Sequence, residues 1–243
     1  MKGYIVIVLL VGLLAAQSRT SALEAEKARI EHGKQLLQHA QRAMGGAVKL
    51  AAVKDVTHKM EITLTPAAGG IKFKQTSFFV APNYIRQELE MPFGKVTFYA
   101  DGKSGWLVTP QGAQAMPADV LGVARGVIFR QPSTLLLSER DAARSVKAIA
   151  ENTVEISTTD GLIVRLEFDA ATGLLARQLY TEAGANGSPS ERVEIFSDWR
   201  EVGGIKMPYK AVQQENGAQR LELVVSEYSI NSGLTAEQLS NQP

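Results

Sequence analysis

The chain has 243 residues, of which 45% are apolar and 21% charged, the composition of an ordinary globular protein rather than a disordered one. Its 26 basic and 25 acidic residues nearly cancel, so no large net field attracts nucleic acid or anionic headgroups. It contains no cysteine, which excludes disulfides, thiolate catalysis, cysteine-bound zinc and lipidation of an N-terminal cysteine.

The N-terminus carries an uncharged apolar run over residues 4–16, preceded by Lys2. This is the length of the apolar part of a signal peptide, whereas a membrane-spanning helix needs about 20 such residues. Ala22 offers a small residue for cleavage. We expect residues 1–22 to be a signal peptide and residues 23–243 a single domain. An uncleaved anchor and an ordinary cytoplasmic helix are the alternatives for the N-terminal segment.

Residues 23–44 lack proline, are rich in Glu, Lys, Gln and Ala, and place apolar residues close to three- and four-residue spacing. This pattern predicts an amphipathic helix. Gly45 and Gly46 follow it directly, and glycine is the usual residue just after a helix. We therefore expect the helix to end there.

From residue 56 the apolar residues alternate with polar ones, so that Val56, His58 and Met60 share one face. A period of two is typical of a strand with one buried face. Similar segments recur along the chain. The predicted strands cover residues 56–65, 71–81, 84–91, 96–101, 105–109, 146–150, 153–158, 162–168, 174–181, 192–199, 205–214 and 218–230.

The turns between these strands include Asp160-Gly161 and Asn216-Gly217, dipeptides that favour tight hairpins. Short turns between successive strands predict an antiparallel meander, and no fixed period indicates a repeat protein. A sheet of about ten or eleven strands is too large to stay flat and open. The predicted fold class is mainly β (α+β), an incomplete antiparallel β barrel with an N-terminal helix and helices inserted mid-chain.

The inserted helices are expected within residues 117–139, where Asp119, Arg125 and Arg130 are the only charges between residues 118 and 138. Pro132 divides the segment, because proline cannot continue a helix beyond its first turn. We predict two short helices here. Since the segment is so apolar, it must cover an apolar surface, and it is the candidate lid of the barrel.

No catalytic or cofactor motif such as HExxH, GxSxG, a P-loop or GxGxxG occurs in the sequence. His32, His39 and His58 have no partner at a spacing typical of metal sites. Glu88 and Glu90 lie on one strand face and are better explained as a solvated charged surface than as a catalytic pair. We therefore predict no enzyme activity, no catalytic residue, no metal and no cofactor.

Aromatic residues on the alternating strands and apolar residues of the insert could face a common interior. They could form an ordinary packed core, or line a cavity, because a curled sheet covered by helices encloses a space. We favour a cavity for acyl chains, since burying each methylene contributes about 0.8 kcal/mol without directional contacts. The predicted cavity residues are Phe73, Phe79, Phe98, Trp106, Leu121, Ile128, Phe129, Phe168, Trp199 and Tyr209.

Several stretches together resemble bacterial outer-membrane lipoprotein-sorting proteins of the LolA/LolB-like superfamily. They are residues 43–46 (AMGG), 50–54 (LAAVK), 99–106 (YADGKSGW) and 196–208 (FSDWREVGGIKMP). The resemblance implies an incomplete barrel with a helical lid, a hydrophobic cavity, a periplasmic location and carriage of lipid or of lipoprotein acyl chains. Because cysteine is absent, the chain resembles the soluble carrier more than the lipid-anchored receptor.

The resulting hypothesis is a monomeric, non-enzymatic periplasmic carrier of lipid or acylated lipoprotein cargo, with envelope membrane proteins as further partners and no binding of nucleic acid. An uncleaved N-terminus would tether it to the inner membrane. The alternative is an envelope sensor or accessory protein-binding module on the same fold, whose interior is filled by its own side chains.

Overall fold

The structure, a computed structural model, describes residues 3–184 and 187–242, with side chains described from residue 21 onward. The strands are β1 (Asp55–Leu64), β2 (Lys72–Val80), β3 (Tyr84–Met91), β4 (Gly94–Ala100), β5 (Gly105–Thr109), β6 (Gly112–Ala115), β7 (Arg144–Ala150), β8 (Thr153–Thr158), β9 (Ile163–Phe168), β10 (Leu175–Ala183), β11 (Pro189–Val202), β12 (Ile205–Glu215) and β13 (Ala218–Ile230). The helices are α1 (Gly3–Ala43), α2 (Ala47–Ala51), α3 (Ala118–Phe129), α4 (Pro132–Leu135) and α5 (Ala236–Ser240), with 3-10 turns η1 (Pro66–Ala68) and η2 (Ser138–Arg140).

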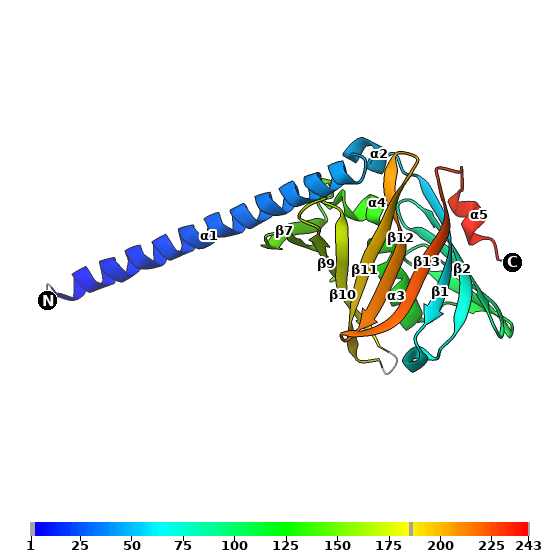
Figure 1. The fold of residues 1–243 in the computed structure, drawn as a ribbon. Helices are drawn as coiled ribbons and strands as arrows, with labels where there is room; N and C mark the ends of the chain where they lie inside the picture. The colour runs from blue at the N-terminus through cyan, green and yellow to red at the C-terminus, as the bar shows by residue number, and fades with distance from the viewer. Residues whose placement is uncertain (1–2, 185–186, 243) are drawn as a thin grey trace.

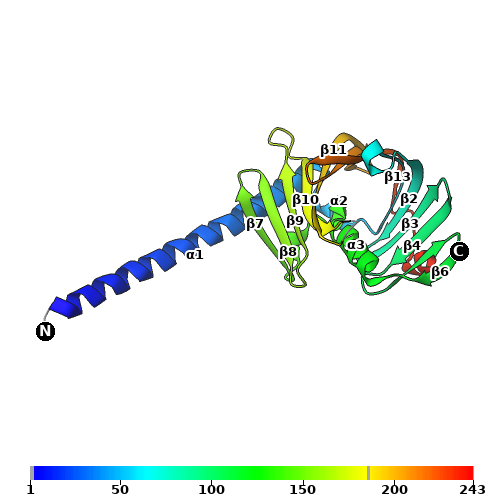
Figure 2. The same cartoon turned by 90° about the horizontal axis from the view of Figure 1, so that it is seen from below.

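The strands form one antiparallel sheet of thirteen, in the order β6-β5-β4-β3-β2-β1-β13-β12-β11-β10-β9-β8-β7. The sheet curls around a central space, and its edge strands β6 and β7 stay apart (Figures 1 and 2). The predicted incomplete barrel is confirmed. It has more strands than expected, in part because β6 consists of small exposed residues whose sequence shows no apolar alternation.

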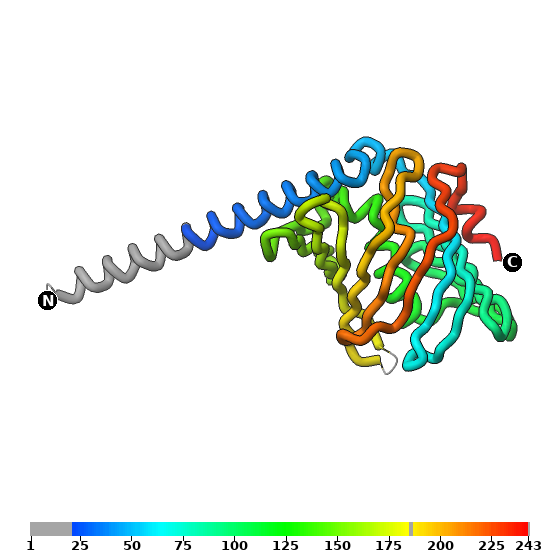
Figure 3. Tube along the Cα trace, in the orientation of Figure 1, coloured from blue at the N-terminus to red at the C-terminus, as the bar shows by residue number. Residues whose placement is uncertain are grey.

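The connection from β6 to β7 explains the position of the inserted helices. Every other pair of successive strands is a hairpin, as the tube in Figure 3 shows, but β6 and β7 are opposite edges of the sheet. The chain between them must cross the open side of the barrel, and it does so as α3 and α4 (Figure 2). Pro132 begins α4, so the predicted division of this segment is confirmed.

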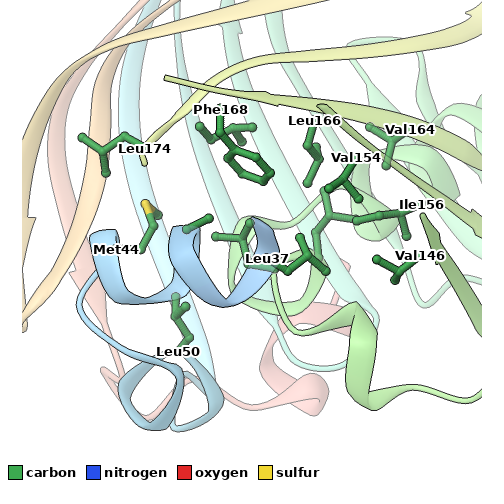
Figure 4. Packing of buried hydrophobic residues seen from close by; sticks show 14 of the residues in the cluster. Leu37, Met44, Leu50, Val146, Val154, Ile156, Val164, Leu166, Phe168 and Leu174 are labelled. Carbon is green, nitrogen blue, oxygen red and sulfur yellow. The ribbon is translucent and has the colours of Figure 1, made fainter. Parts of the chain in front are cut away.

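Helix α1 packs against the part of the sheet that includes β7 and β8. Leu37 and Met44 are fully buried, and Figure 4 shows Leu37 close to Val154 and Ile156 of β8. Burying a leucine side chain contributes about 2 kcal/mol, so these contacts fix the helix on the sheet. Gly46 donates its backbone N–H to Gln41 O (2.7 Å) where the helix ends, as predicted.

The part of α1 before Gly33 whose side chains are described contributes no buried residue to the core. Residues 21–31 are exposed, and residues 1–20 of the predicted signal peptide lie outside the part of the chain whose side chains are described. Among the helices of that described part, none has an apolar stretch long enough to cross a bilayer.

Two smaller cores complete the fold. On the concave side, Ala124 and Ile128 of α3 pack with Ile85 and Ala100 of β3 and β4. On the opposite face, Leu239 of the C-terminal helix α5 packs with Tyr99 and Trp106 of β4 and β5. The sheet is therefore covered on both faces around β3 to β5.

The closest approach of α1 to the sheet occurs at Gly33. A Cβ placed there would lie 2.8 Å from the backbone nitrogen of Ala148 and 2.9 Å from the carbonyl carbon of Lys147. Backbone atoms of a paired strand cannot move aside cheaply. Arg29 Nε also donates to Ala148 O (3.1 Å), so this point joins the helix to β7.

We expect Gly33→Ala to lower the free energy of unfolding by about 1–3 kcal/mol, because overpacking outweighs the gain of about 1 kcal/mol in helix propensity. The matched control is Gly122→Ala in α3, where an added Cβ would have no heavy atom within 4 Å. That variant should be as stable as the parent or more stable. Urea unfolding of the three proteins tests this, and equal effects of the two substitutions would contradict the packing described for Gly33.

Candidate functional site

A hollow lies between the lid helices and the concave face of the sheet, and Leu50 of α2 is also in its lining. It has a volume of about 1110 Å³, counting the space open to solvent at its mouth. Its apolar lining residues are Met44, Leu50, Val53, Val56, Met60, Val127, Pro132, Phe196, Ile205, Met207, Pro208, Ala211, Leu223, Val225 and Ile230.

Strand register places these side chains on one wall. Val56 of β1 is paired with Ile230 of β13, and Ala211 of β12 is paired with Leu223 of β13. Directly opposed residues on neighbouring strands share a face of the sheet, and every second residue returns to that face. The alternation at β1 that is visible in the sequence therefore continues across β13 and β12 as the cavity wall.

A hydrogen-bonded polar group lies at the side of the cavity formed by β10 to β12. Tyr180 Oη donates to Glu194 Oε1 (2.8 Å), and Gln213 Nε2 donates to the same oxygen (3.2 Å). Burial, with Glu194 beside it, raises the pKa of Tyr180 well above its ordinary value, so the phenol stays protonated. Glu194 borders the cavity, and the hydrogen bonds from Tyr180 and Gln213 stabilise its negative charge.

His58 is the titratable group of the opposite wall. Burial lowers the pKa of His58 to about 4, so the imidazole is neutral at pH 7. Its ring lies 5.3 Å from that of Tyr228, whose hydroxyl donates to Pro208 O (2.9 Å). His58 is partly exposed because it borders the cavity. Its Nδ1, however, is buried and has no hydrogen-bond partner among the described residues. The wall is thus apolar with one neutral imidazole.

The described residues hold no cluster of three or more His, Cys, Asp or Glu side chains that could bind a metal ion. Among the polar residues that line the cavity, Glu194 is hydrogen-bonded and Arg130 is ion-paired, whereas His58 Nδ1 and Gln178 Oε1 have no partner among the described residues. The mostly apolar wall suits the exclusion of water from an apolar ligand.

None of the residues predicted for a lipid-binding cavity is among the residues that line this hollow. Trp106 lies on the opposite face of the sheet. It is paired with Tyr99, and its Nε1 donates to Ser240 O (2.9 Å) at the end of α5. Period two places a residue on one of two faces, and α5 supplies a second covered face that the pattern cannot reveal.

Three of the predicted residues pack under or within α3. Phe98, Leu121 and Ile128 belong to the core between α3 and the strands β3 and β4. Their side chains point toward the interior, but they fill the space where α3 contacts the sheet.

The others take part in tight packing as well. Phe129 and Phe168 belong to the main core, and Trp199 packs against that core. Phe79 is buried on β2 beside Val56.

The remaining two lie near the cavity's borders. Phe73 of β2 is paired with Ile62 on the concave face. The ring of Tyr209 lies 5.2 Å from that of Tyr228, so it contacts a wall residue from outside. Large aromatic side chains fill space rather than leave it, and the cavity is lined mostly by Val, Ile, Met, Leu and Ala.

No protein-family model matches this sequence, and no curated protein matches it. Its fold, in contrast, is shared with several solved structures. A LolA superfamily protein from Nitrosomonas europaea has a TM-score of 0.60 at 11% identity, with 86% of this chain and 97% of that chain covered. A DUF1329 family protein from Desulfovibrio piger has a TM-score of 0.55 at 12% identity, with 87% and 97% covered.

A domain named for outer membrane lipoprotein sorting, from Vibrio parahaemolyticus, has a TM-score of 0.53 at 13% identity, with 86% of this chain and 97% of that chain covered. The chain therefore has a LolA-like fold, as the sequence resemblance implied. At such low identity the similarity concerns the arrangement of strands and lid and does not extend to individual side chains.

The lowered pKa of His58 has a measurable consequence. Between its ordinary pKa of 6.5 and its folded value of about 4, the unfolded chain binds a proton that the folded protein does not. The free energy of unfolding should therefore fall by up to about 3 kcal/mol from this group as the pH falls through that window. Above pH 7, His58 should contribute no pH dependence.

His58→Phe keeps an aromatic ring against Tyr228 and removes the titrating group. Urea unfolding at several pH values should show a flatter decline between pH 6.5 and 4 for the variant than for the parent, while His32, His39 and the carboxylates remain in both. Parallel pH profiles of the two proteins would show that His58 is not buried as described.

Proposed function

We propose that this protein is a non-enzymatic carrier that binds the acyl chains of lipids or lipoproteins in the apolar cavity, acting in the periplasm after export. The observation that carries the proposal is the cavity itself: about 1110 Å³, apolar on most of its wall, and roofed by a helical lid. A LolA-like fold supports it, because one structure with this fold is a domain named for lipoprotein sorting.

The energetics suit an acyl chain. Ten buried methylenes contribute about 8 kcal/mol, from which the cost of association is subtracted. The remaining affinity is moderate, which suits a protein that must release its cargo. Because Glu194 and Arg130 at the cavity border already face oppositely charged or polar side chains, binding of a chain leaves no charge newly unpaired.

Cargo reaches the cavity when the lid moves. The polar contacts that hold the lid to the sheet are mostly long or exposed. Arg125 pairs with Asp160 at the surface, and Arg130 lies 3.7 Å from Glu182. Gln178 Nε2 donates to Arg130 O at 3.5 Å, and Arg144 Nη1 donates to Thr134 O at 3.4 Å, both near the limit for a hydrogen bond. Helices α3 and α4 are short and joined at Gln131. A small rotation of the pair would expose the cavity.

The N-terminal segment fits export. We propose that residues 1–22 form the signal peptide and residues 23–243 the single mature domain, with an uncleaved tether as the alternative. In the part of α1 whose side chains are described, residues 21–31 are exposed and the first buried residue is Gly33, so cleavage near Ala22 leaves the packed part of the helix intact. The mature protein would act as a monomer that meets its partners at the envelope membranes.

The first test of the carrier proposal is native mass spectrometry of the exported protein, combined with displacement of a fluorescent fatty acyl probe. A co-purifying lipid or acylated peptide, and saturable probe binding, are expected. If the protein is empty and ignores the probe, the carrier proposal fails and the protein-binding module takes its place.

Filling the cavity should abolish that binding. Ala211 faces the cavity from the middle of β12, so Ala211→Phe should weaken probe binding about tenfold or more by occupying the space of the chain. Val212→Phe is the matched control, because Val212 is paired with Glu222 and Ile195 on the other face of the same strand. Equal binding by the two folded variants would place the acyl site elsewhere.

A further inference from the structure

A second, smaller pocket lies on the far side of α3. It has a volume of about 620 Å³, open to solvent, between α3 and the ends of β9 and β10. Gly122 and Gly126 of α3 form one wall, and Thr181, Glu182 and Asp119 supply polar groups. Its lining is mixed, since Val123, Phe129 and Ile163 also contribute, but it has a larger polar share than the main cavity and so can accommodate a polar group.

Arg130, just after α3, borders both hollows. Its guanidinium lies on the second pocket's side, since a Cβ at Gly126 would be 2.7 Å from Arg130 Nη1. It sits 3.5 Å above the ring of Tyr180 and 3.7 Å from Glu182 Oε2. The residue therefore stands at the boundary between an apolar and a polar compartment.

The guanidinium of Arg130 has hydrogen-bonding capacity to spare. Its side chain is 10% exposed, and none of the described residues accepts a hydrogen bond from it, because 3.7 Å to Glu182 exceeds hydrogen-bond length. A guanidinium has five N–H donors, and the ion pair with Glu182 leaves most of them free to bind water or a ligand from the adjoining hollows. An acceptor oxygen brought by a ligand would satisfy them.

The surrounding charges favour a neutral acceptor over an anion. Glu182 lies between Arg130 and Arg192, 3.7 Å and 3.4 Å away, and Arg192 also pairs with Glu215 (2.7 Å). Arg220 pairs with the same Glu215, so this cluster joins three arginines to two glutamates. The lining of the second pocket itself, however, sets Asp119 and Glu182 against Arg130 alone. A further anion there would add to the excess of negative charge, whereas a carbonyl oxygen accepts a hydrogen bond and adds no charge.

We infer that Arg130 binds the carbonyl oxygen of an acyl ester or amide whose chain occupies the main cavity and whose polar head enters the second pocket. In the protein, the guanidinium lies between the apolar cavity and the second pocket. In an acylated amphiphile, the carbonyl group likewise lies between the apolar chain and the polar head. This inference rests on the proposed carrier function, and it makes Arg130 a specificity-determining residue for acyl over alkyl cargo.

The test compares two glycerol lipids with the same C16 chain and the same uncharged head, 1-palmitoylglycerol (ester-linked) and 1-hexadecylglycerol (ether-linked), which differ by the carbonyl. The parent protein should bind the ester about tenfold more tightly, the effect of one hydrogen bond from a charged donor. In Arg130→Met this preference should disappear, with binding of the ether form retained. Equal affinities for the two lipids in the parent protein would overturn the inference, while failure of both to bind would overturn the carrier function itself.

A second variant tests the head pocket without disturbing Arg130. A side chain at Gly122 points into open space and improves helix propensity, so Gly122→Leu fills the pocket in a folded protein. It should raise the dissociation constant of 1-palmitoylglycerol, relative to that of methyl palmitate, about tenfold, because the methyl ester has no head to place. An unchanged ratio would show that the head does not enter this pocket.

Discussion

The pairing of β1 with β13 joins the two halves of the molecule. Strands β1 to β6 form one meander and β7 to β13 another, and this ladder is the sole pairing between strands distant in sequence within the described sheet. It holds together residues about 170 positions apart, such as His58 and Tyr228. Because the twist of a long antiparallel sheet curls it, these two strands lie at the back of the barrel and their concave residues line the cavity. The edges then face each other across a gap that the chain itself must bridge.

The lid follows from that topology. A connection between opposite edges has to cross the open side, and an apolar helix is the form of chain that satisfies its own backbone while covering an apolar hollow. The same crossing brings the end of α3 to β10, where Arg130 meets Tyr180 and Glu182. Arg130, at the end of the lid helix α3, therefore also borders the cavity. Movement of the lid and contact with a bound ligand would both involve this side chain.

The fold is shared with proteins of only 11–13% identity, so its requirements are patterns of apolar spacing, turns and strand length rather than particular residues. Such a scaffold can hold different cargo by changing the side chains of the cavity wall and of the lid's edge. In this chain the cavity wall contains a neutral His58, and Arg130 at the edge of the lid has N–H donors that no described residue accepts. These are the features by which its cargo would differ from that of other proteins with this fold.

The sequence alone determined the features that depend on neighbours along the chain: the helix ending at Gly45, the alternating strands, the apolar insert divided at Pro132, and hence the lidded incomplete barrel. It missed β6, whose small residues do not alternate, and none of the residues that it proposed for a cavity lines the hollow beneath the lid. Period two separates two faces of a strand, but whether Trp106 or Ala211 borders a hollow depends on which distant segments pack above it. A void is what remains where side chains from β1, β12, β13 and the lid fail to meet, so only the tertiary structure could locate it.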